Sequence, residues 1–194
     1  MKLNTLADLL TEQLKDLYCA ETQLTKALPK MIKKASTTSL SETIQDHLEQ
    51  TKVHVERLEE IGQTLGITLT GHKCKAMEGL IKEGAEAMEK TGDDRVIDAG
   101  LIAAAQRVEH YEISGYGTAR TLAEQLGHHA VAKILRMTEE EESAADEKLT
   151  MLAVDEIYPS LRLINDHAES EESDEDDDET PGMKKKQAMM SSER

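Results

Sequence analysis

The 194-residue chain suits one domain with a full core, and its 39 acidic against 23 basic residues give a net charge of −16. This charge argues against nucleic acid or an anionic membrane as the main partner. Without Phe or Trp, and with four Tyr, the core must be built from Leu, Ile, Ala and Met, which favours packed helices over a sheet. The longest apolar runs fall short of the roughly 20 residues of a membrane span, and the first eight residues do not resemble a signal peptide. We therefore expect a cytoplasmic protein.

Helical periodicity predicts a first helix from Leu6 to Lys34. Asn4 or Thr5 caps it, and Asp8 stands three residues after Thr5, as in a capping box. Pro29 is expected to kink the helix or to break off its last segment, because proline lacks the backbone N–H of a helix interior.

A second helix is predicted from Ser39 to Leu65. Ser39 and Glu42 have the spacing of a capping box, and Gly66 is the expected stop. Its apolar face is formed by Ile44, Leu48, Thr51, Val55, Leu58 and Leu65.

A shorter amphipathic segment follows over 74–89, and two more long helices are predicted over 94–126 and 129–157. We expect Pro159 to stop the last one. Four long helices with a short connecting helix between the second and third predict an all-α four-helix bundle that occupies residues 1–168. The segment 169–194 begins with ESEESDEDDDET, which carries nine of the acids and no apolar residue, so we expect an acidic disordered tail.

Carboxylates interrupt the apolar faces of three of the long helices. They are Glu21 in the first helix, Glu109 and Glu112 in the third, and Glu142 and Asp146 in the fourth. Burying a carboxylate costs roughly several kcal/mol per ion unless something offsets its charge. Lys and Arg, which could offset it, are scarce on these faces. A multivalent cation between facing helices is one explanation. The alternatives are carboxylates that share protons and a helix whose acids face solvent.

The second helix contributes imidazoles and an amide. His47, Gln50, Thr51 and His54 lie on or beside its apolar face. The Glu-x-x-His motif that is usual in di-iron bundles does not occur in these helices, because Glu49 is followed at i+3 by Lys52 and Glu142 by Ala145.

Three segments carry a family resemblance: CKAMEGLI at 74–81, LIAAAQRVEHYEISGYGTARTLAEQLG at 101–127 and EEESAADEKLT at 140–150. They resemble the YciF-like branch of the ferritin-like superfamily, a bacterial stress-associated family, and the similarity covers residues 6–153. The resemblance implies a ferritin-like or rubrerythrin-like bundle, a homodimer and a dinuclear metal site. The family usually has Glu-Thr where this chain has Gln50-Thr51, so that corner of the site is vacant, filled by water, or completed by His47 or His54. The expected metal ligands are Glu21, Gln50, His54, Glu109, Glu112, Glu142 and Asp146.

Two functions remain open at this point. The first is a metal protein with two iron ions, or manganese as the second choice, that oxidises ferrous iron or consumes peroxide in a stress response. The second is a helical stress or scaffold protein that has kept the bundle and lost the chemistry.

Several other residues are assigned structural roles. Cys19 and Cys74 are expected to be reduced packing residues, because they form neither a CxxC pair nor a disulfide framework. His110 points away from the apolar face and is a surface or dimer-contact residue. Tyr18 and Tyr116 lie one turn from inward carboxylates and are core residues with one polar partner, or redox-active tyrosines. Gly115 and Gly117 each cost a helix about 1 kcal/mol, which indicates close helix approach.

Overall fold

A computed structural model describes residues 3–161. The described part is helical and contains no strand: α1 (Leu6–Lys34), α2 (Thr38–Leu65), α3 (Lys75–Met88), α4 (Asp94–Gln125), α5 (His129–Leu152) and a π-helical turn, η1 (Ala153–Ile157). The prediction of four long helices with a short connecting helix is confirmed. The predicted acidic tail, and the last residues assigned to the bundle, lie outside the described residues. No helix within 3–161 is long and apolar enough to cross a membrane.

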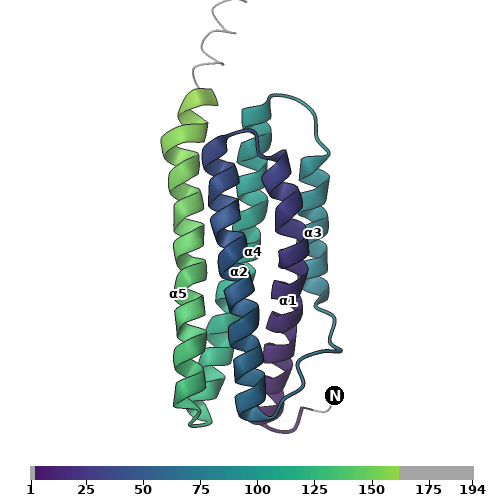
Figure 1. Cartoon of the computed structure of the whole chain (residues 1–194), viewed down its shortest axis with the longest axis vertical. Coiled ribbons are helices and arrows are strands. Elements are labelled where there is room, and N and C mark those ends of the chain that lie inside the picture. The colour runs from purple at the N-terminus through teal and green to yellow at the C-terminus, as the bar shows by residue number, and fades with distance from the viewer. Residues whose placement is uncertain (1–2, 162–194) are drawn as a thin grey trace, which may run out of the picture.

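The four long helices form one bundle in which each contacts two neighbours (Figure 1). α1 pairs with α2 and α4 pairs with α5, while α2 also contacts α5 and α1 contacts α4. The connection from α2 to α4 runs back along the length of the bundle and includes α3, which packs outside against α1 and α4. This long crossover places residues from all four long helices around one shared interior.

Local sequence signals account for most helix ends. The Thr5 side chain accepts a hydrogen bond from the Asp8 N–H while the Asp8 carboxylate accepts one from Thr5 N–H, so the predicted capping box is present. Gly66 ends α2 in the left-handed conformation at φ +66°, which glycine adopts without steric cost. Asp93 caps α4 by accepting from two backbone N–H groups.

The predicted capping box at Ser39 is wrong, because the Ser39 side chain bonds to a residue distant in sequence instead of capping α2. α2 begins one residue earlier with Thr37 as its N-cap, and the Ser39 hydroxyl donates instead to Glu156 at 2.7 Å. The buried Asp98 carboxylate of α4 accepts four hydrogen bonds, from the backbone N–H and hydroxyl groups of Ser36 and Thr37. These bonds fix the α1–α2 turn against α4.

Neither Pro29 nor Pro159 breaks the helix around it. α1 runs through Pro29 to Lys34, the predicted end, and Leu24 and Leu28 in the turn before the proline are buried in the core. Helical residues also continue past Pro159 to residue 161. The wider turn of η1 comes just before this proline, with the Tyr158 N–H donating to the Ala153 carbonyl.

The core consists of two apolar clusters with a buried polar layer between them. One contains Leu24, Leu28, Ile44 and Leu101, and the other contains Leu14, Leu17, Leu58 and Leu135, each with further residues. The polar belt, as we name the layer, separates the two clusters along every long helix. It consists of Glu21, His47, Thr51, His54, Glu109, Glu112, Thr138 and Glu142.

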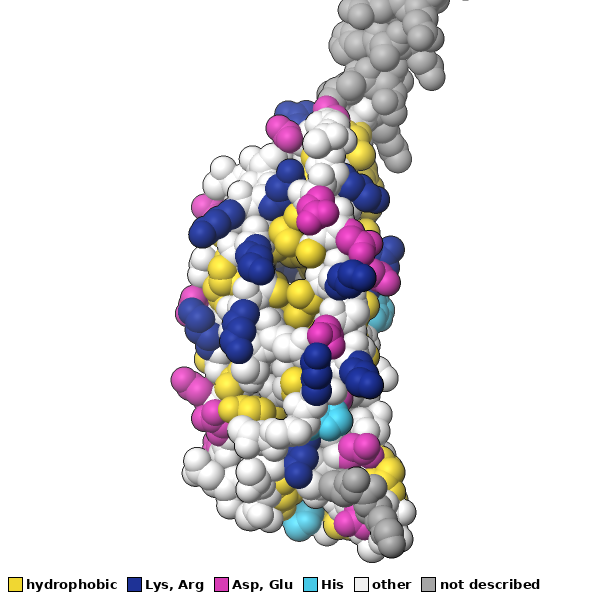
Figure 2. Space-filling view, turned by 90° about the vertical axis from the view of Figure 1, so that its right-hand side faces the viewer, with side chains coloured by type: hydrophobic (Ala, Val, Ile, Leu, Met, Phe, Trp, Pro, Cys, Tyr) yellow, Lys and Arg dark blue, Asp and Glu magenta, His cyan; other side chains and the backbone are white. Residues whose placement is uncertain are grey.

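The face that carries α3 is hollowed between α1, α3 and α4. Figure 2 shows hydrophobic side chains around this hollow, with Lys and Arg side chains surrounding them. The hollow is lined mainly by apolar residues, among them Leu24, Met31, Ile81 and Met88, and it ends at Glu109 of the polar belt.

Candidate metal centre

Each long helix contributes ligating side chains to the polar belt. α1 provides Glu21, α4 provides Glu109 and Glu112 three residues apart, and α5 provides Glu142. α2 provides His47 and His54, which are seven residues apart and therefore share a face. His47 is 7% exposed and the other five are 0–2% exposed. The bundle thus removes four carboxylates and two imidazoles from water at one depth.

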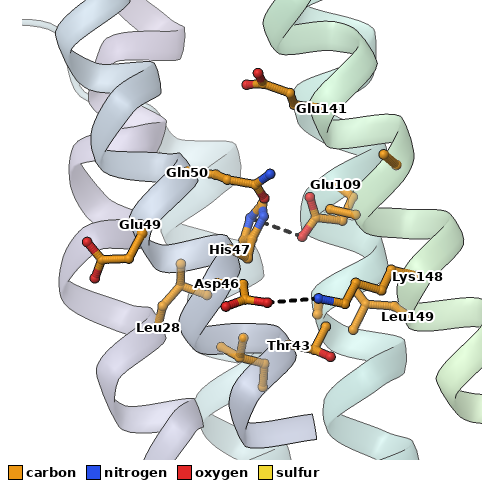
Figure 3. A pocket seen from close by; sticks show the side chains of 14 residues that line it. Leu28, Thr43, Asp46, His47, Glu49, Gln50, Glu109, Glu141, Lys148 and Leu149 are labelled. Atoms are coloured by element: carbon orange, nitrogen blue, oxygen red, sulfur yellow. Dashed lines mark hydrogen bonds and ion pairs between the residues drawn. The ribbon is translucent and has the colours of Figure 1, made fainter. Parts of the chain in front are cut away.

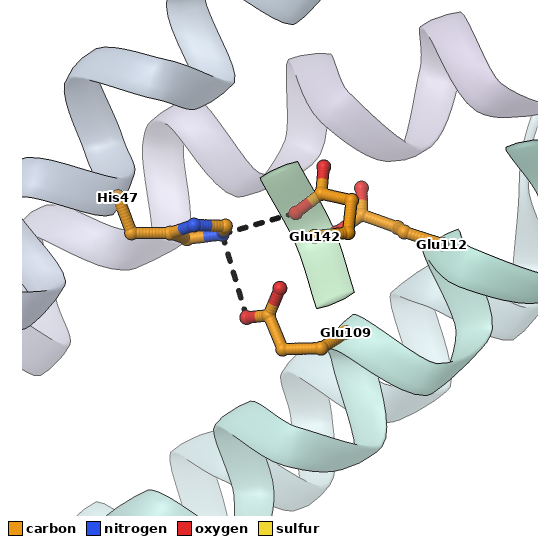
Figure 4. Close-up of side chains that lie close together, drawn as sticks. All are labelled: His47, Glu109, Glu112 and Glu142. Atoms are coloured by element: carbon orange, nitrogen blue, oxygen red, sulfur yellow. Dashed lines mark ion pairs between the residues drawn. The ribbon is translucent and has the colours of Figure 1, made fainter. Parts of the chain in front are cut away.

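These residues form two groups that share one member. The first contains His47, Glu109, Glu112 and Glu142, and the second contains Glu21, His54 and Glu142. Within each group, one ligand atom from every residue lies within 4.8 Å of the others. Figure 4 shows the three carboxylates of the first group gathered on one side of the His47 ring. His47 Nε2 lies 3.4 Å from Glu109 Oε1 and 4.0 Å from Glu142 Oε2.

Most of the ligand atoms in this layer have no hydrogen-bond partner within the described chain. They are Glu21 Oε2, both nitrogens of His47, His54 Nδ1, Glu109 Oε2, and both oxygens of Glu112 and of Glu142. An unsatisfied buried polar group is costly, and a buried charge is more so. Asp98 shows the contrast, because it is equally buried on α4 but accepts four hydrogen bonds. The polar belt therefore fits a cation, since bare carboxylate oxygens and imidazole nitrogens are the donors that iron and manganese take.

Two residues outside both groups orient the His54 ring. His54 Nε2 lies 2.8 Å from Glu141 Oε2, and Arg57 holds that carboxylate with two N–H groups at 2.6 and 3.0 Å. With Nε2 protonated toward Glu141, His54 Nδ1 presents its lone pair to the interior. Nδ1 lies 2.9 Å from Glu142 Oε1 and 3.4 Å from Glu21 Oε1, without the angles of a hydrogen bond to either. A carboxylate behind an imidazole is the usual support of a metal-binding histidine.

Tyr116 supports Glu21 in a similar way. Its buried hydroxyl donates to Glu21 Oε1 at 2.5 Å and leaves Oε2 free. Of the two tyrosines singled out in the sequence, Tyr116 therefore contacts the centre, whereas the Tyr18 hydroxyl donates to Glu59 on the exposed side of α2.

The charges of the layer are strongly coupled. Burial, followed by the repulsion of neighbouring carboxylates, raises the pKa of Glu109 and Glu112 well above the ordinary value. Burial also raises the pKa of Glu21 to about 7, although His54 opposes it. Burial lowers the pKa of His54, but contacts with Glu142 and Glu21 outweigh this and raise it to about 10. Burial raises the pKa of Glu142 as well, but its contacts with His54 outweigh this and lower it. Without a cation, Glu109 and Glu112 thus retain protons that they would release in water.

A pocket connects the layer to the surface between α2 and α5. Its volume is about 370 Å³, and His47 and Glu109 form part of its lining. Figure 3 shows the Lys148–Asp46 ion pair, with its atoms 3.0 Å apart, bridging α5 and α2 in this pocket. The pocket gives small polar species an approach to the first group of ligands.

Two of the expected ligands are not buried in the layer. Gln50 is exposed and lies beside His47 in the pocket (Figure 3). Asp146 is partly exposed and accepts a hydrogen bond from the Gln106 amide at 3.0 Å, with His110 Nε2 3.6 Å away. His110 is largely exposed, as expected. Both imidazoles that the sequence left as alternatives, His47 and His54, are in the layer instead.

Sequence reasoning missed Glu141 and Arg57. Glu141 precedes Glu142 in a run of four glutamates, and periodicity gave no reason to single it out. Arg57 stands three residues after His54 and therefore on nearly the same face of α2. That spacing was the available signal for an arginine that supports the histidine indirectly.

Comparison with known proteins gives a consistent result. Residues 5–161 match the family model described as Domain of unknown function (DUF892). The chain is 47% identical over 158 residues to Protein YciF of Escherichia coli strain K12, which covers 81% of this chain and 95% of that protein.

Three solved structures are similar. The crystal structure of the E. coli stress protein YciF matches with a TM-score of 0.76 at 48% identity, covering 78% of this chain and 96% of that one. YcfI, a putative structural protein from Rhodopseudomonas palustris, matches with a TM-score of 0.74 at 45% identity, covering 77% and 95%. A protein from Xanthomonas campestris, at 18% identity and a TM-score of 0.65 over 83% and 99% of the two chains, shares the fold.

Proposed function

We propose, for a chain that belongs to the DUF892 family and is a homologue of the YciF stress protein, a role in metal binding. In this proposal the polar belt binds a pair of iron or manganese ions. The observation that carries the proposal is the pair of ligand groups joined by Glu142. A carboxylate has two oxygens, so one Glu142 side chain suits both groups at once.

The residues divide between two positions. His47, Glu109 and Glu112 would hold one ion, and Glu21 and His54 the other, with Glu142 common to both. Four carboxylates and two imidazoles form the donor set of carboxylate-bridged bundles.

When bound, such ions would supply the electron transfer needed to oxidise ferrous iron or to reduce peroxide. The chain's own residues prepare the site. Glu141 and Arg57 hold the His54 ring so that Nδ1 faces inward, and Tyr116 fixes one oxygen of Glu21. The apolar clusters on both sides exclude water from the layer, while the pocket between α2 and α5 leaves one approach open. We also propose that the protein acts as a homodimer, as the family resemblance implies.

One observation favours the second function, a stress or scaffold protein without metal chemistry. His54 has carboxylate oxygens near both ring nitrogens, at 2.8 and 2.9 Å, and a doubly protonated ring would offset part of the negative charge. This pairing reaches Glu21 and Glu142 and leaves Glu112 without a partner.

The deciding experiment measures metal content and stability together. Protein purified without chelator is analysed for metals, and the metal-free chain is then titrated with Mn²⁺, or with Fe²⁺ without oxygen. We expect close to two ions per chain. At a free concentration about 100 times Kd each ion would add about 2.7 kcal/mol of stability, or roughly 5–10 °C in Tm. A Tm that neither ion changes, together with no bound metal, would favour the scaffold function.

A further inference from the structure

A second cluster of reactive side chains lies outside the polar belt, where the start of α3 meets α1 and α4. It contains Cys19 and Asp16 of α1, Cys74 as the N-cap of α3, and Tyr111 of α4. His72, in the preceding loop, contacts Asp16 at 2.9 Å. None of these residues belongs to either ligand group described above.

The two cysteines of this cluster are in direct contact. The backbone N–H of Cys74 donates to Cys19 Sγ at 3.2 Å. Because a backbone nitrogen and its Cα are about 1.46 Å apart, Cys19 Sγ lies within about 4.7 Å of the Cys74 Cα. Both thiols are free.

The Cys74 sulfur has hydrogen-bond partners of its own on α1, α3 and α4. Cys74 Sγ lies 3.3 Å from Asp16 Oδ2 and 3.1 Å from the Tyr111 hydroxyl. It also accepts a long hydrogen bond, 3.4 Å, from the Met77 N–H at the start of α3. Rotation about the Cα–Cβ bond of Cys74 moves its sulfur toward Cys19 while the backbone contact between the two residues stays in place.

We propose that Cys19 and Cys74 are a thiol pair that hydrogen peroxide oxidises to an intramolecular disulfide. The Cys19 thiolate attacks one peroxide oxygen, the O–O bond breaks, and the leaving hydroxide takes up a proton to become water. The resulting sulfenic acid is attacked by the Cys74 sulfur, which forms the S–S bond and releases a second water. In sum, two thiols and one peroxide give one disulfide and two waters.

The surroundings divide the two roles. Cys19 is partly exposed, and its sulfur accepts N–H groups from Cys74 at 3.2 Å and from the Gln23 amide at 3.4 Å. Cys74 is 1% exposed, so peroxide in solution reaches Cys19 first. Burial also raises the pKa of the Cys74 thiol, which disfavours its ionisation and its direct reaction with peroxide.

The bond would link α1 to the N-cap residue of α3. It would also release the Tyr111 hydroxyl and Asp16 from Cys74, leaving their mutual hydrogen bond. The proposal is independent of metal binding, since both cysteines lie outside the ligand groups.

The test uses the full chain, freed of metal with a chelator and treated with a small excess of hydrogen peroxide. We expect both thiols to become unreactive toward iodoacetamide together, with the mass lowered by two hydrogens and a Cys19–Cys74 peptide found on digestion. A thiol reductant should restore both. Cys74→Ser should instead accumulate a sulfenic acid on Cys19 that dimedone traps, whereas Cys19→Ser should react at least tenfold more slowly.

A third variant tests the role of the sulfur's present partners. Tyr111→Phe removes one hydrogen bond that Cys74 Sγ has to give up when it bonds to Cys19, so this variant should form the disulfide faster than the wild type. Two results would overturn the proposal: wild-type thiols that remain reactive after peroxide, and a disulfide that joins two chains instead of one. Both are read from the wild-type protein, so they do not depend on how well the serine variants fold.

Discussion

Asp98 and Glu112 are both fully buried on α4, yet they differ in what surrounds them. Asp98 accepts four hydrogen bonds from Ser36 and Thr37, and Glu112 accepts none within the described chain. The first carboxylate therefore stabilises the fold through its hydrogen bonds. The second has no hydrogen-bond partner for either oxygen, and the two residues form a matched pair for mutation.

We expect Glu112→Gln to lower metal content and to raise the Tm of the metal-free chain. Burial first, and then repulsion by Glu21, Glu142 and Glu109, opposes ionisation of Glu112, and the amide removes this unfavourable ionisable group. A gain of about 1 kcal/mol corresponds to roughly 2–4 °C. Asp98→Asn is the control and should lower Tm, because hydrogen bonds to a charged group contribute about 1.5–3 kcal/mol. Equal destabilisation by the two variants in thermal unfolding would contradict the proposed site.

Glu141 permits a test of indirect support at the centre. Glu141→Gln should weaken Mn²⁺ binding about 10–100-fold, because it removes the carboxylate that orients the His54 ring and leaves Arg57 without its partner. Glu140→Gln, on the exposed neighbouring residue, should leave affinity unchanged. Isothermal titration calorimetry measures both. The interpretation fails if the two variants bind alike.

Among the helices, close approach of α1 and α4 explains one of the two glycines singled out in the sequence of α4, Gly115 and Gly117. A Cβ on Gly115 would lie 2.8 Å from Leu17 Cδ2, in the buried core. A Cβ on Gly117 would meet only the end of the Glu139 side chain, at 2.9 Å, which is flexible and partly exposed. Close helix approach was predicted for both glycines, and the structure shows it at Gly115.

Alanine at these two positions should have opposite effects. Gly117→Ala should stabilise the chain by up to about 1 kcal/mol, through the higher helix propensity of alanine. Gly115→Ala should destabilise it, since overpacking a core costs about 1–3 kcal/mol and exceeds that gain. Urea unfolding monitored by circular dichroism gives both values. A stabilised Gly115→Ala variant would show that Leu17 moves aside freely.

The predictability of the elements follows from how local their causes are. Helix ends set by neighbours in sequence, such as Thr5 with Asp8 and the stop at Gly66, were predicted correctly. The start of α2 was not predicted correctly, because Ser36 and Thr37 hydrogen-bond to Asp98, which lies about 60 residues away in the sequence. A capping motif shows which hydrogen bonds a residue is able to make within its helix. Only the tertiary fold shows which distant groups compete for the same side chain.

The same distinction holds for the site. An apolar stripe broken by an acid is a periodic signal, and it located Glu21, Glu109, Glu112 and Glu142 in the buried layer. Asp146 satisfied the same spacing but lies at the edge of the α4–α5 contact, where the Gln106 amide reaches it. The position of a residue around its helix was predictable, whereas its distance from the bundle axis depends on how the helices pack.

For the whole molecule, the polar belt divides one core into two apolar clusters, and its protonation is therefore linked to global stability. Burial first, against the opposing effect of His54, raises the pKa of Glu21 from 4.5 to about 7, so the folded chain keeps a proton that the unfolded chain releases. Stability from this group is present below about pH 4.5 and is lost as pH rises to about 7. The shift corresponds to about 3 kcal/mol.

His54 acts in the same direction over a higher range, since its pKa is raised from 6.5 to about 10 and its contribution is lost as pH rises through that window. The metal-free chain should therefore lose Tm steadily from about pH 5 to about pH 9. Bound ions reverse this dependence, because they require carboxylates and a neutral imidazole, so binding releases protons and strengthens as pH rises. Thermal unfolding at several pH values, with and without Mn²⁺, should show a difference in Tm that widens with pH. A difference that stays constant or narrows would mean that the ions bind elsewhere and that the buried layer keeps its protons.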